Sequence, residues 1–293
     1  ELSTALNNWF DDSSGAIVNY GHITNWDVSQ VTDMAELFEN KTSFNEDISS
    51  WDVSNVTTMS YMFNGAESFN QPLNNWNVSN VKVMSGMFKD AELFNQPLWN
   101  VSNVTKMPSM FRNTKSFNQD ISNWNVAQVT DMYYTFYEAE SFNQPLNNWN
   151  VSSVTTIQAM FYKATSFNQD ISNWNVVNVT NMEKTFEGAS AFDQPLNNWN
   201  VAQVTNMISY GLNSGHSEPL FTDSNQYYFT VNQETISQSN IQTAVNDWIS
   251  DPTNATGKYD GHISTWDVSQ VTNMNSLFYD TSGTYSSFNE DIS

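Results

Sequence analysis

The chain has 293 residues, 31 acidic side chains against 9 basic ones, a formal net charge of −22 and no cysteine. This negative charge disfavours binding to nucleic acid, which requires Lys and Arg to displace counterions, and it disfavours binding to anionic lipid surfaces. The lack of cysteine excludes a disulfide framework and a thiolate metal site. Since no run of about 18 apolar residues occurs, the sequence predicts no transmembrane helix.

Residues 1–24 are predicted to form an N-terminal cap. Residues 2–12 indicate a short amphipathic helix, because Leu2, Leu6 and Trp9 fall on one face. The turn-forming residues 13–15 are expected to end this helix. A helix placed before a repeat array covers the apolar end that the array would otherwise expose.

Residues 25–207 form a repeat array, and residues 69–91 (FNQPLNNWNVSNVKVMSGMFKDA) show its pattern. One tryptophan marks each repeat: Trp26, Trp51, Trp76, Trp99, Trp124, Trp149, Trp174 and Trp199, with a restart at Trp266. Successive tryptophans from 26 to 199 are 25 residues apart, except for one interval of 23 between Trp76 and Trp99. A fixed period in this range predicts a solenoid in which each coil touches only its neighbours.

Within one repeat the apolar residues change their spacing. Trp51 and Val53 are two residues apart, which predicts a short strand with both side chains inward. Val81, Met84 and Phe88 follow a helical spacing. The sequence therefore predicts an α/β leucine-rich-repeat solenoid of about 25-residue coils, each with a short parallel strand and a short helix.

The pattern is lost in residues 208–238, which are predicted to be a C-terminal cap or a joint between modules. Residues 239–293 repeat the opening of the chain, since Trp248 and Trp266 correspond to Trp9 and Trp26. This segment is interpreted as the cap and first repeat of a second, truncated array. The chain is accordingly expected to be part of a longer protein built from tandem arrays.

The motif F-N-Q-[DP]-[IL]-x-x-W-[ND]-V-S-x-V-T-x-M-x-x-M-F resembles that of the BspA-like leucine-rich-repeat surface proteins, in the version common in mycoplasma surface lipoproteins. The resemblance covers residues 20–207 and 260–293. It implies a non-enzymatic, secreted or cell-surface protein used in adhesion, and hence a partner that is a protein or glycan on another cell or matrix. It carries no ligand residue across, because the matching positions are the structural core.

Two surfaces are candidates for ligand binding. One is an outward row of small polar residues: Asp27, Asp52, Asn77, Asn100, Asn125, Asn150, Asn175 and Asn200. This row varies little, so it suits either self-paired amide ladders or a repetitive ligand such as a glycan chain or ice. The other surface varies from coil to coil and includes Tyr133 and Tyr134, as a specific protein partner would require.

A further row follows each repeat phenylalanine: Asn45, Asn70, Asn95, Asn118, Asn143, Asn168 and Asp193. It is predicted to be an amide ladder that satisfies backbone groups of the loop, because buried polar groups must be paired. The alternative is a row of ligand contacts.

No catalytic or metal motif is recognisable. The histidines are not clustered with other ligands as zinc requires, and neither residues 11–15 nor residues 251–260 match a calcium loop of the EF-hand type. The sequence therefore predicts no enzyme and no cofactor, with calcium in the caps as an alternative. The predicted function is an adhesin or interaction module, and the alternatives are a binder of a repetitive ligand or a passive spacer.

Overall fold

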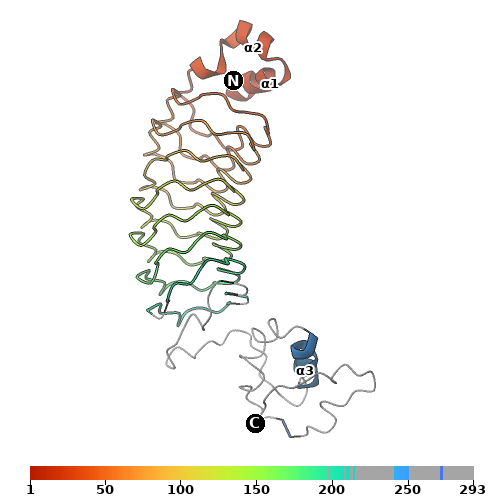
Figure 1. Cartoon of the computed structure of the whole chain (residues 1–293). Coiled ribbons are helices and arrows are strands. Elements are labelled where there is room, and N and C mark those ends of the chain that lie inside the picture. Colours follow the sequence, from red (N-terminus) through yellow and green to blue (C-terminus); the bar gives the residue numbers. More distant parts are fainter. Residues whose placement is uncertain (197, 208, 212–213, 215–240, 251–270, 273–293) are drawn as a thin grey trace.

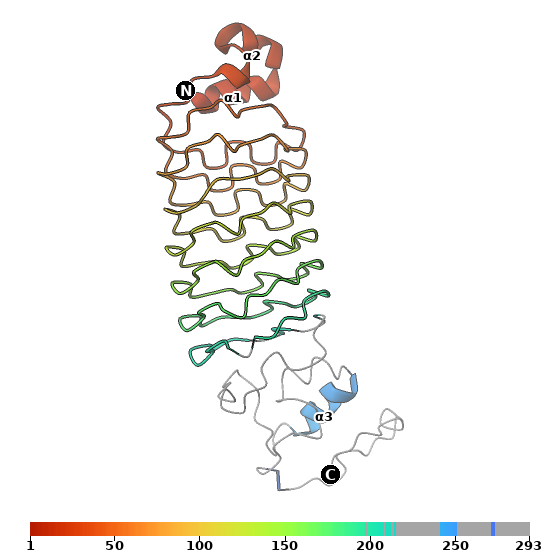
Figure 2. The same cartoon turned by 60° about the vertical axis from the view of Figure 1, so that its left-hand side comes forward.

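The computed structural model describes residues 1–196, 198–207, 209–211, 214, 241–250 and 271–272. In the first part of the chain, coils are stacked along one axis, and the two helices α1 (Leu2–Asp11) and α2 (Ser13–Tyr20) lie over the N-terminal end of the stack (Figures 1 and 2). A short 3-10 helix, η1 (Ile23–Asn25), leads into the first coil. The segment predicted to open a second array contains α3 (Ile241–Ser250); residues 215–238 lie outside the described residues.

The N-terminal cap contains one helix more than predicted. Helix α1 buries Ala5, Leu6 and Trp9, so the apolar face that the sequence indicated is confirmed. The chain then becomes extended at Asp12, with φ −150° and ψ 90°, and a second helix begins directly at Ser13. Residues 13–15 therefore start α2, and the prediction that they simply end the first helix was wrong.

The α/β prediction of a leucine-rich-repeat strand and helix in each coil was wrong. Among the described residues of the array, β-pairing between neighbouring coils is limited to isolated parallel bridges, from Asp33 with Thr58 to Asn181 with Asn206. Two residues in each complete coil have a positive φ; in one coil they are Tyr134 at 57° and Glu138 at 54°. Helices and strands both need negative φ throughout, so neither can form across such a segment.

The apolar spacing that suggested a helix is instead satisfied by overlapping β-turns. The N–H groups of Met87 and Lys89 each donate to the carbonyl three residues before them, at 3.3 and 3.1 Å. The N–H groups of Gly86 and Phe88, which alternate with these, donate to carbonyls of the next coil at 2.8 and 2.9 Å. Half of the backbone donors in this segment thus close turns, and the other half join neighbouring coils.

The core residues predicted from the repeat are confirmed, since every apolar residue named in residues 51–53 and 81–88 is buried. At the centre stand two columns of phenylalanines: Phe38, Phe63, Phe88, Phe111, Phe136, Phe161 and Phe186 in one, and Phe44, Phe69, Phe94, Phe117, Phe142, Phe167 and Phe192 in the other. Ring centroids in adjacent coils are 5.3–5.9 Å apart in the first column. Between the columns they are 4.0–4.1 Å apart. Each coil therefore adds one pair of rings to a continuous offset stack.

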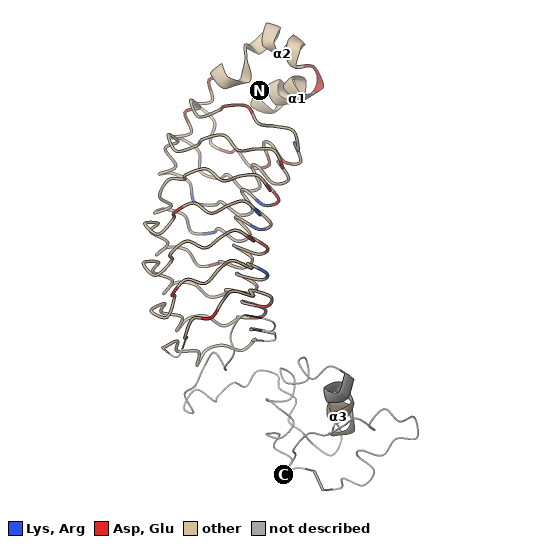
Figure 3. Cartoon of the chain, viewed as in Figure 1, with Lys and Arg blue, Asp and Glu red and all other residues tan. Residues whose placement is uncertain are grey.

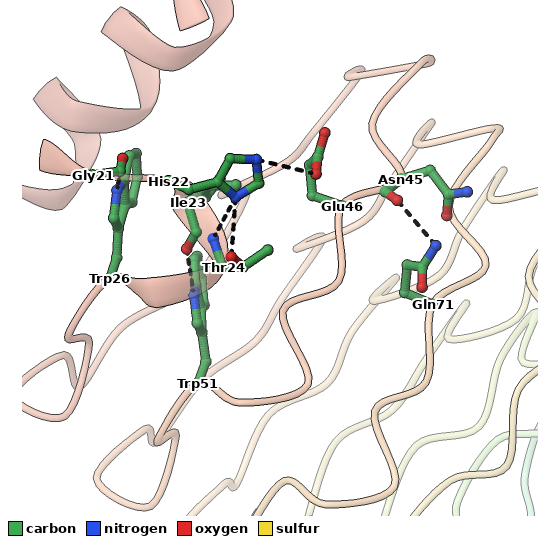
Figure 4. A network of polar contacts seen from close by, with 9 residues as sticks. All are labelled: Gly21, His22, Ile23, Thr24, Trp26, Asn45, Glu46, Trp51 and Gln71. Atoms are coloured by element: carbon green, nitrogen blue, oxygen red, sulfur yellow. Dashed lines mark hydrogen bonds and ion pairs between the residues drawn. The ribbon is translucent and has the colours of Figure 1, made fainter. Parts of the chain in front are cut away.

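The tryptophans tie each coil to the one before it. Trp51 Nε1 donates to the Ile23 carbonyl at 3.0 Å (Figure 4), and five tryptophans make this bond at 2.9–3.1 Å: Trp51, Trp76, Trp149, Trp174 and Trp199. The 23-residue coil interrupts the row. The indole nitrogens of Trp99, which directly follows the missing two residues, and of Trp124 in the next coil are buried without an acceptor.

Replacing an alanine by glycine should destabilise the chain at one of two neighbouring sites and have little effect at the other. Ala159 is buried at φ 48°, where a side chain costs about 1–2 kcal/mol, so Ala159→Gly relieves strain that offsets the lost methyl group. Ala164 is equally buried but is not among the positive-φ residues, so Ala164→Gly should destabilise by about 1 kcal/mol or more. Urea denaturation of both variants measures the difference, and equal losses would contradict the turn geometry.

Phenylalanine substitutions should distinguish the two kinds of tryptophan. Trp149→Phe removes a hydrogen bond and leaves the buried Ile121 carbonyl without its indole donor. Both substitutions also shorten the buried ring system, but the indole N–H that Trp124→Phe removes has no acceptor. Because the Ile121 carbonyl still accepts from the Trp124 backbone N–H at 3.1 Å, we expect Trp149→Phe to be the more destabilising by about 0.5–1.5 kcal/mol. Chemical denaturation monitored by circular dichroism tests this, and a larger loss for Trp124→Phe would contradict it.

Candidate functional site

The outward row of small polar residues lies on the surface as predicted, and all eight members are exposed: Asp27, Asp52, Asn77, Asn100, Asn125, Asn150, Asn175 and Asn200. We call it the Asx row. In seven of them the side-chain oxygen accepts a hydrogen bond from the backbone N–H two residues later, at 3.0–3.3 Å. These are Asx turns, which use the oxygen inside its own coil. The row is therefore not the self-paired amide ladder offered as one alternative.

Asn100 is the exception in the Asx row and belongs to the shortened coil. Its Nδ2 donates to the Asn123 carbonyl at 2.9 Å, and its Oδ1 accepts from the Asn125 N–H at 3.2 Å. This side chain bridges to the next coil instead of closing a turn. The two-residue deletion thus changes the surface as well as the tryptophan row.

Hydrogen bonds lower the pKa of the aspartates in these turns. For Asp27 and Asp52 the main causes are the Ser29 and Ser54 side chains, followed by the backbone N–H groups of the same serines. Asp47 and Asp120 have lowered pKa values for the same reason, through Ser49 and Ser122. The ionised carboxylates are therefore part of the turn structure and are not held as reactive acids.

The row that follows the phenylalanines is the amide ladder that the sequence predicted. Asn45 Oδ1 accepts from the Asn70 backbone N–H at 2.9 Å, and the same bond, at 2.9–3.0 Å, continues through every coil to Asp193. The neighbouring glutamines reinforce it, beginning with Gln71 Nε2 on the Asn45 carbonyl at 3.0 Å (Figure 4). The side-chain oxygens are engaged between coils, so this row serves the scaffold.

The face formed by the overlapping β-turns, here called the turn-rich face, differs from coil to coil. In the middle coils it carries a cluster of aromatic and basic side chains. Tyr133, Tyr134, Tyr137, Tyr162 and Arg112, here the tyrosine cluster, are all half-buried. Tyr137 and Tyr162 stack at 4.5 Å, and Tyr134 meets Tyr133 and Tyr137 edge-on at 5.3 and 5.4 Å. The guanidinium of Arg112 lies 4.7 Å from the Tyr137 ring centroid and 5.5 Å from that of Tyr134.

Charge surrounds the tyrosine cluster. Lys163 Nζ lies 3.6 Å from Glu138 Oε1 and also faces the Tyr162 ring. Figure 3 shows acidic and basic segments next to each other along one edge of the middle coils. Burial raises the pKa of Tyr133 and Tyr137, and it raises the pKa of Asp131, whose carboxylate accepts from the Tyr133 N–H at 3.2 Å. The phenols of Tyr133 and Tyr137 therefore remain neutral donors at physiological pH.

Sequence reasoning found only part of this cluster. Tyr133 and Tyr134 stood out because they differ from their equivalents in other coils. Tyr137 and Tyr162 were missed, although they are 25 residues apart and therefore occupy the same position in adjacent coils. An aromatic pair at one repeat interval, outside the core motif, was the available signal.

In the described part of the chain no three His, Asp or Glu side chains come together as metal ligands would. Asp11 and Asp12, considered as calcium ligands, are exposed, while residues 251–260 lie outside the described residues. None of the described helices is both long and apolar enough to cross a membrane.

The geometry defines the described repeat array of this chain as a solenoid built from β-turns. The chain belongs to a family described as "Mycoplasma protein of unknown function, DUF285", whose model matches residues 4–98, 97–179, 147–211 and 219–293. The comparison supports a Mycoplasma-type repeat protein and does not single out the BspA-like leucine-rich repeats. Comparisons with curated proteins and with solved structures gave no significant match.

The lowered pKa values of Asp27 and Asp52 predict a pH effect on stability. A depressed pKa adds stability above the usual Asp value of about 3.9, and that stability is lost as pH falls through the folded-state pKa. Asparagine keeps the Asx turn, as at Asn77, but takes up no proton. The Asp27→Asn, Asp52→Asn double variant should therefore lose less stability than the parent when acidified.

Urea unfolding midpoints at about pH 5 and about pH 2.5 measure this difference on either side of the titration. An Asn77→Asp variant is the matched converse, because it adds an acid to the same turn and should increase the acid-dependent loss. Identical pH profiles for all three chains would show that these turns do not couple to protonation.

Proposed function

We propose that this chain is a non-enzymatic interaction module of an extracellular, cell-surface protein, and that the tyrosine cluster is its contact surface. The observation that carries the proposal is the cluster itself: four tyrosines and an arginine packed on one another on the face where coils differ. Tyr and Arg dominate the binding energy of protein interfaces, where they offer large rigid area and directed hydrogen bonds. The resemblance to BspA-like surface proteins supports the same role.

The packing within the cluster also prepares it for binding. Arg112 is held over Tyr134 and Tyr137, and the Tyr137 ring is held by Tyr162 in the next coil. Side chains already restrained in the free protein lose less conformational entropy when a partner covers them. The continuous core beneath keeps the backbone of these coils in register. The surface suits a protein partner that presents acidic or hydrogen-bonding groups to Arg112 and the phenols.

The second candidate is a binder of a repetitive ligand, such as a glycan chain, on the Asx row. The observation favouring it is that an exposed Asp or Asn recurs once in every coil from Asp27 to Asn200. Because its oxygens are mostly used in Asx turns, the row offers mainly amide N–H donors and the remaining oxygen lone pairs. It lacks the aromatic and arginine anchors of the tyrosine cluster.

A binding comparison separates the two candidates. The labelled chain is screened on arrays of matrix proteins and glycans and on cultured cells. The Tyr133→Ala, Tyr134→Ala double variant is then compared with the Asn125→Ala, Asn150→Ala double variant on every positive target. We expect the tyrosine variant to bind at least about 30-fold more weakly, as for a hot spot worth about 2 kcal/mol.

Little change is expected for the asparagine variant, provided that circular dichroism shows both variants folded. The reverse pattern would contradict the tyrosine cluster and favour the repetitive ligand. A chain that binds no target on any of the three supports would contradict both and leave the spacer role.

A further inference from the structure

One position of the coil brings three complementary functional groups into line. Glu39, Asn64 and Lys89 are each 25 residues apart, so they occupy the same place in three consecutive coils. They supply a carboxylate, a carboxamide and a primary amine. The next two coils place Arg112 and Tyr137 at this position, so this combination occurs in the first three coils.

Hydrogen bonds orient the carboxamide of Asn64 between the other two groups. Asn64 is 8% exposed and is one of the few buried polar residues. Its Nδ2 donates to Glu39 Oε1 at 2.6 Å, and its Oδ1 accepts from Lys89 Nζ at 3.4 Å. The amide carbonyl therefore faces the amine, and the amide nitrogen faces the carboxylate. Lys89 Nζ also lies 3.1 Å from Asp90 Oδ2, which keeps the amine at this site.

We propose that Lys89 and Asn64 form an intramolecular isopeptide bond, with Glu39 transferring the proton. The ammonium of Lys89 first loses one proton to solvent. The neutral Nζ then attacks Asn64 Cγ, forming the new C–N bond, and its second proton passes to the Glu39 carboxylate. Glu39 returns that proton to Nδ2 as the Cγ–Nδ2 bond breaks. Ammonia leaves, one amide replaces another, and nothing is oxidised or reduced.

The contacts of Asn64 with Lys89 and Glu39 support this step. Holding an amine against a carbonyl within one folded chain makes the attack intramolecular and greatly raises the effective concentration. A carboxylate at 2.6 Å from the leaving nitrogen is placed to act as general base and then as general acid. Glu39 and Asp90 are the charged groups facing the site, and the attacking amine must be deprotonated, so the reaction should be faster at alkaline pH.

A competing reaction at Asn64 is restrained. Asn64 is followed by Gly65, and attack of the Gly65 nitrogen on Cγ would give a cyclic imide with loss of the same ammonia. The Gly65 N–H instead donates to the Lys89 carbonyl of the next coil at 2.8 Å, which holds this nitrogen in the coil-to-coil ladder. The isopeptide bond joins the same two coils covalently and closes the intervening residues into a loop.

Intact-mass spectrometry of the purified full chain tests the proposal, before and after incubation at alkaline pH. We expect a mass lower than the sequence mass by one ammonia, and a proteolytic fragment in which the peptides containing Asn64 and Lys89 are joined. Lys89→Arg, Asn64→Ala and Glu39→Gln should each abolish or strongly slow the loss. Lys115→Arg is the matched control, because Lys115 pairs with Glu92 at 2.7 Å but faces no carboxamide in its contacts.

Two results would overturn the proposal. One is a mass equal to that of the sequence after prolonged alkaline incubation of a chain that circular dichroism shows to be folded. The other is a loss of ammonia that persists in Lys89→Arg, which would assign it to the cyclic imide at Asn64 and Gly65. The test does not involve partner binding, so its outcome is independent of the proposed function.

Discussion

The hydrogen bonds between successive coils are the constraint on which the rest of this structure depends. In the turn-rich segment alternate N–H groups donate to the next coil, as Phe38 does to the Met62 carbonyl at 2.8 Å. Buried backbone groups must find partners, and here neither a helix nor a continuous sheet supplies them. The bonds bring equivalent residues of neighbouring coils side by side, so every position becomes a column along the axis. The phenylalanine stack and the amide ladder are both consequences of that register.

Departures from the repeat show that the hydrogen bonds between coils depend on an exact alignment of equivalent residues. Removing two residues before Trp99 leaves two indole nitrogens without acceptors and redirects the side chain of Asn100 to the next coil. The positive-φ positions strain the backbone, because most of them carry a residue other than glycine. Gly86 shows why glycine occurs at some of them: an added Cβ would clash with the Tyr61 ring of the preceding coil. Side chains on this face are thus selected in pairs, one coil against the next.

The same alignment of coils also brings functional groups together on the surface. Residues one repeat apart become neighbours, so Tyr137 stacks on Tyr162 and Asn64 lies between Glu39 and Lys89. The Asx row and the amide ladder, in contrast, use most of their oxygens to hold the backbone. Freedom to vary therefore remains mainly on the turn-rich face. Both the proposed contact surface and the proposed covalent bond lie there, although they involve different coils and different groups.

The sequence by itself determined the repeat length, the cap helix α1, the buried residues and the amide ladder. These follow from the identity and spacing of side chains, as with Phe69 and Asn70, which recur with each period. Only the tertiary structure decided the backbone path. Residues 81–91 have a helical spacing of apolar side chains, and overlapping turns bury the same set equally well. The choice between them rests on the next coil, whose carbonyls capture alternate N–H groups and thereby exclude the helix. The sequence of one repeat therefore cannot predict whether it forms a helix or turns, because the carbonyls that accept these hydrogen bonds belong to the next coil.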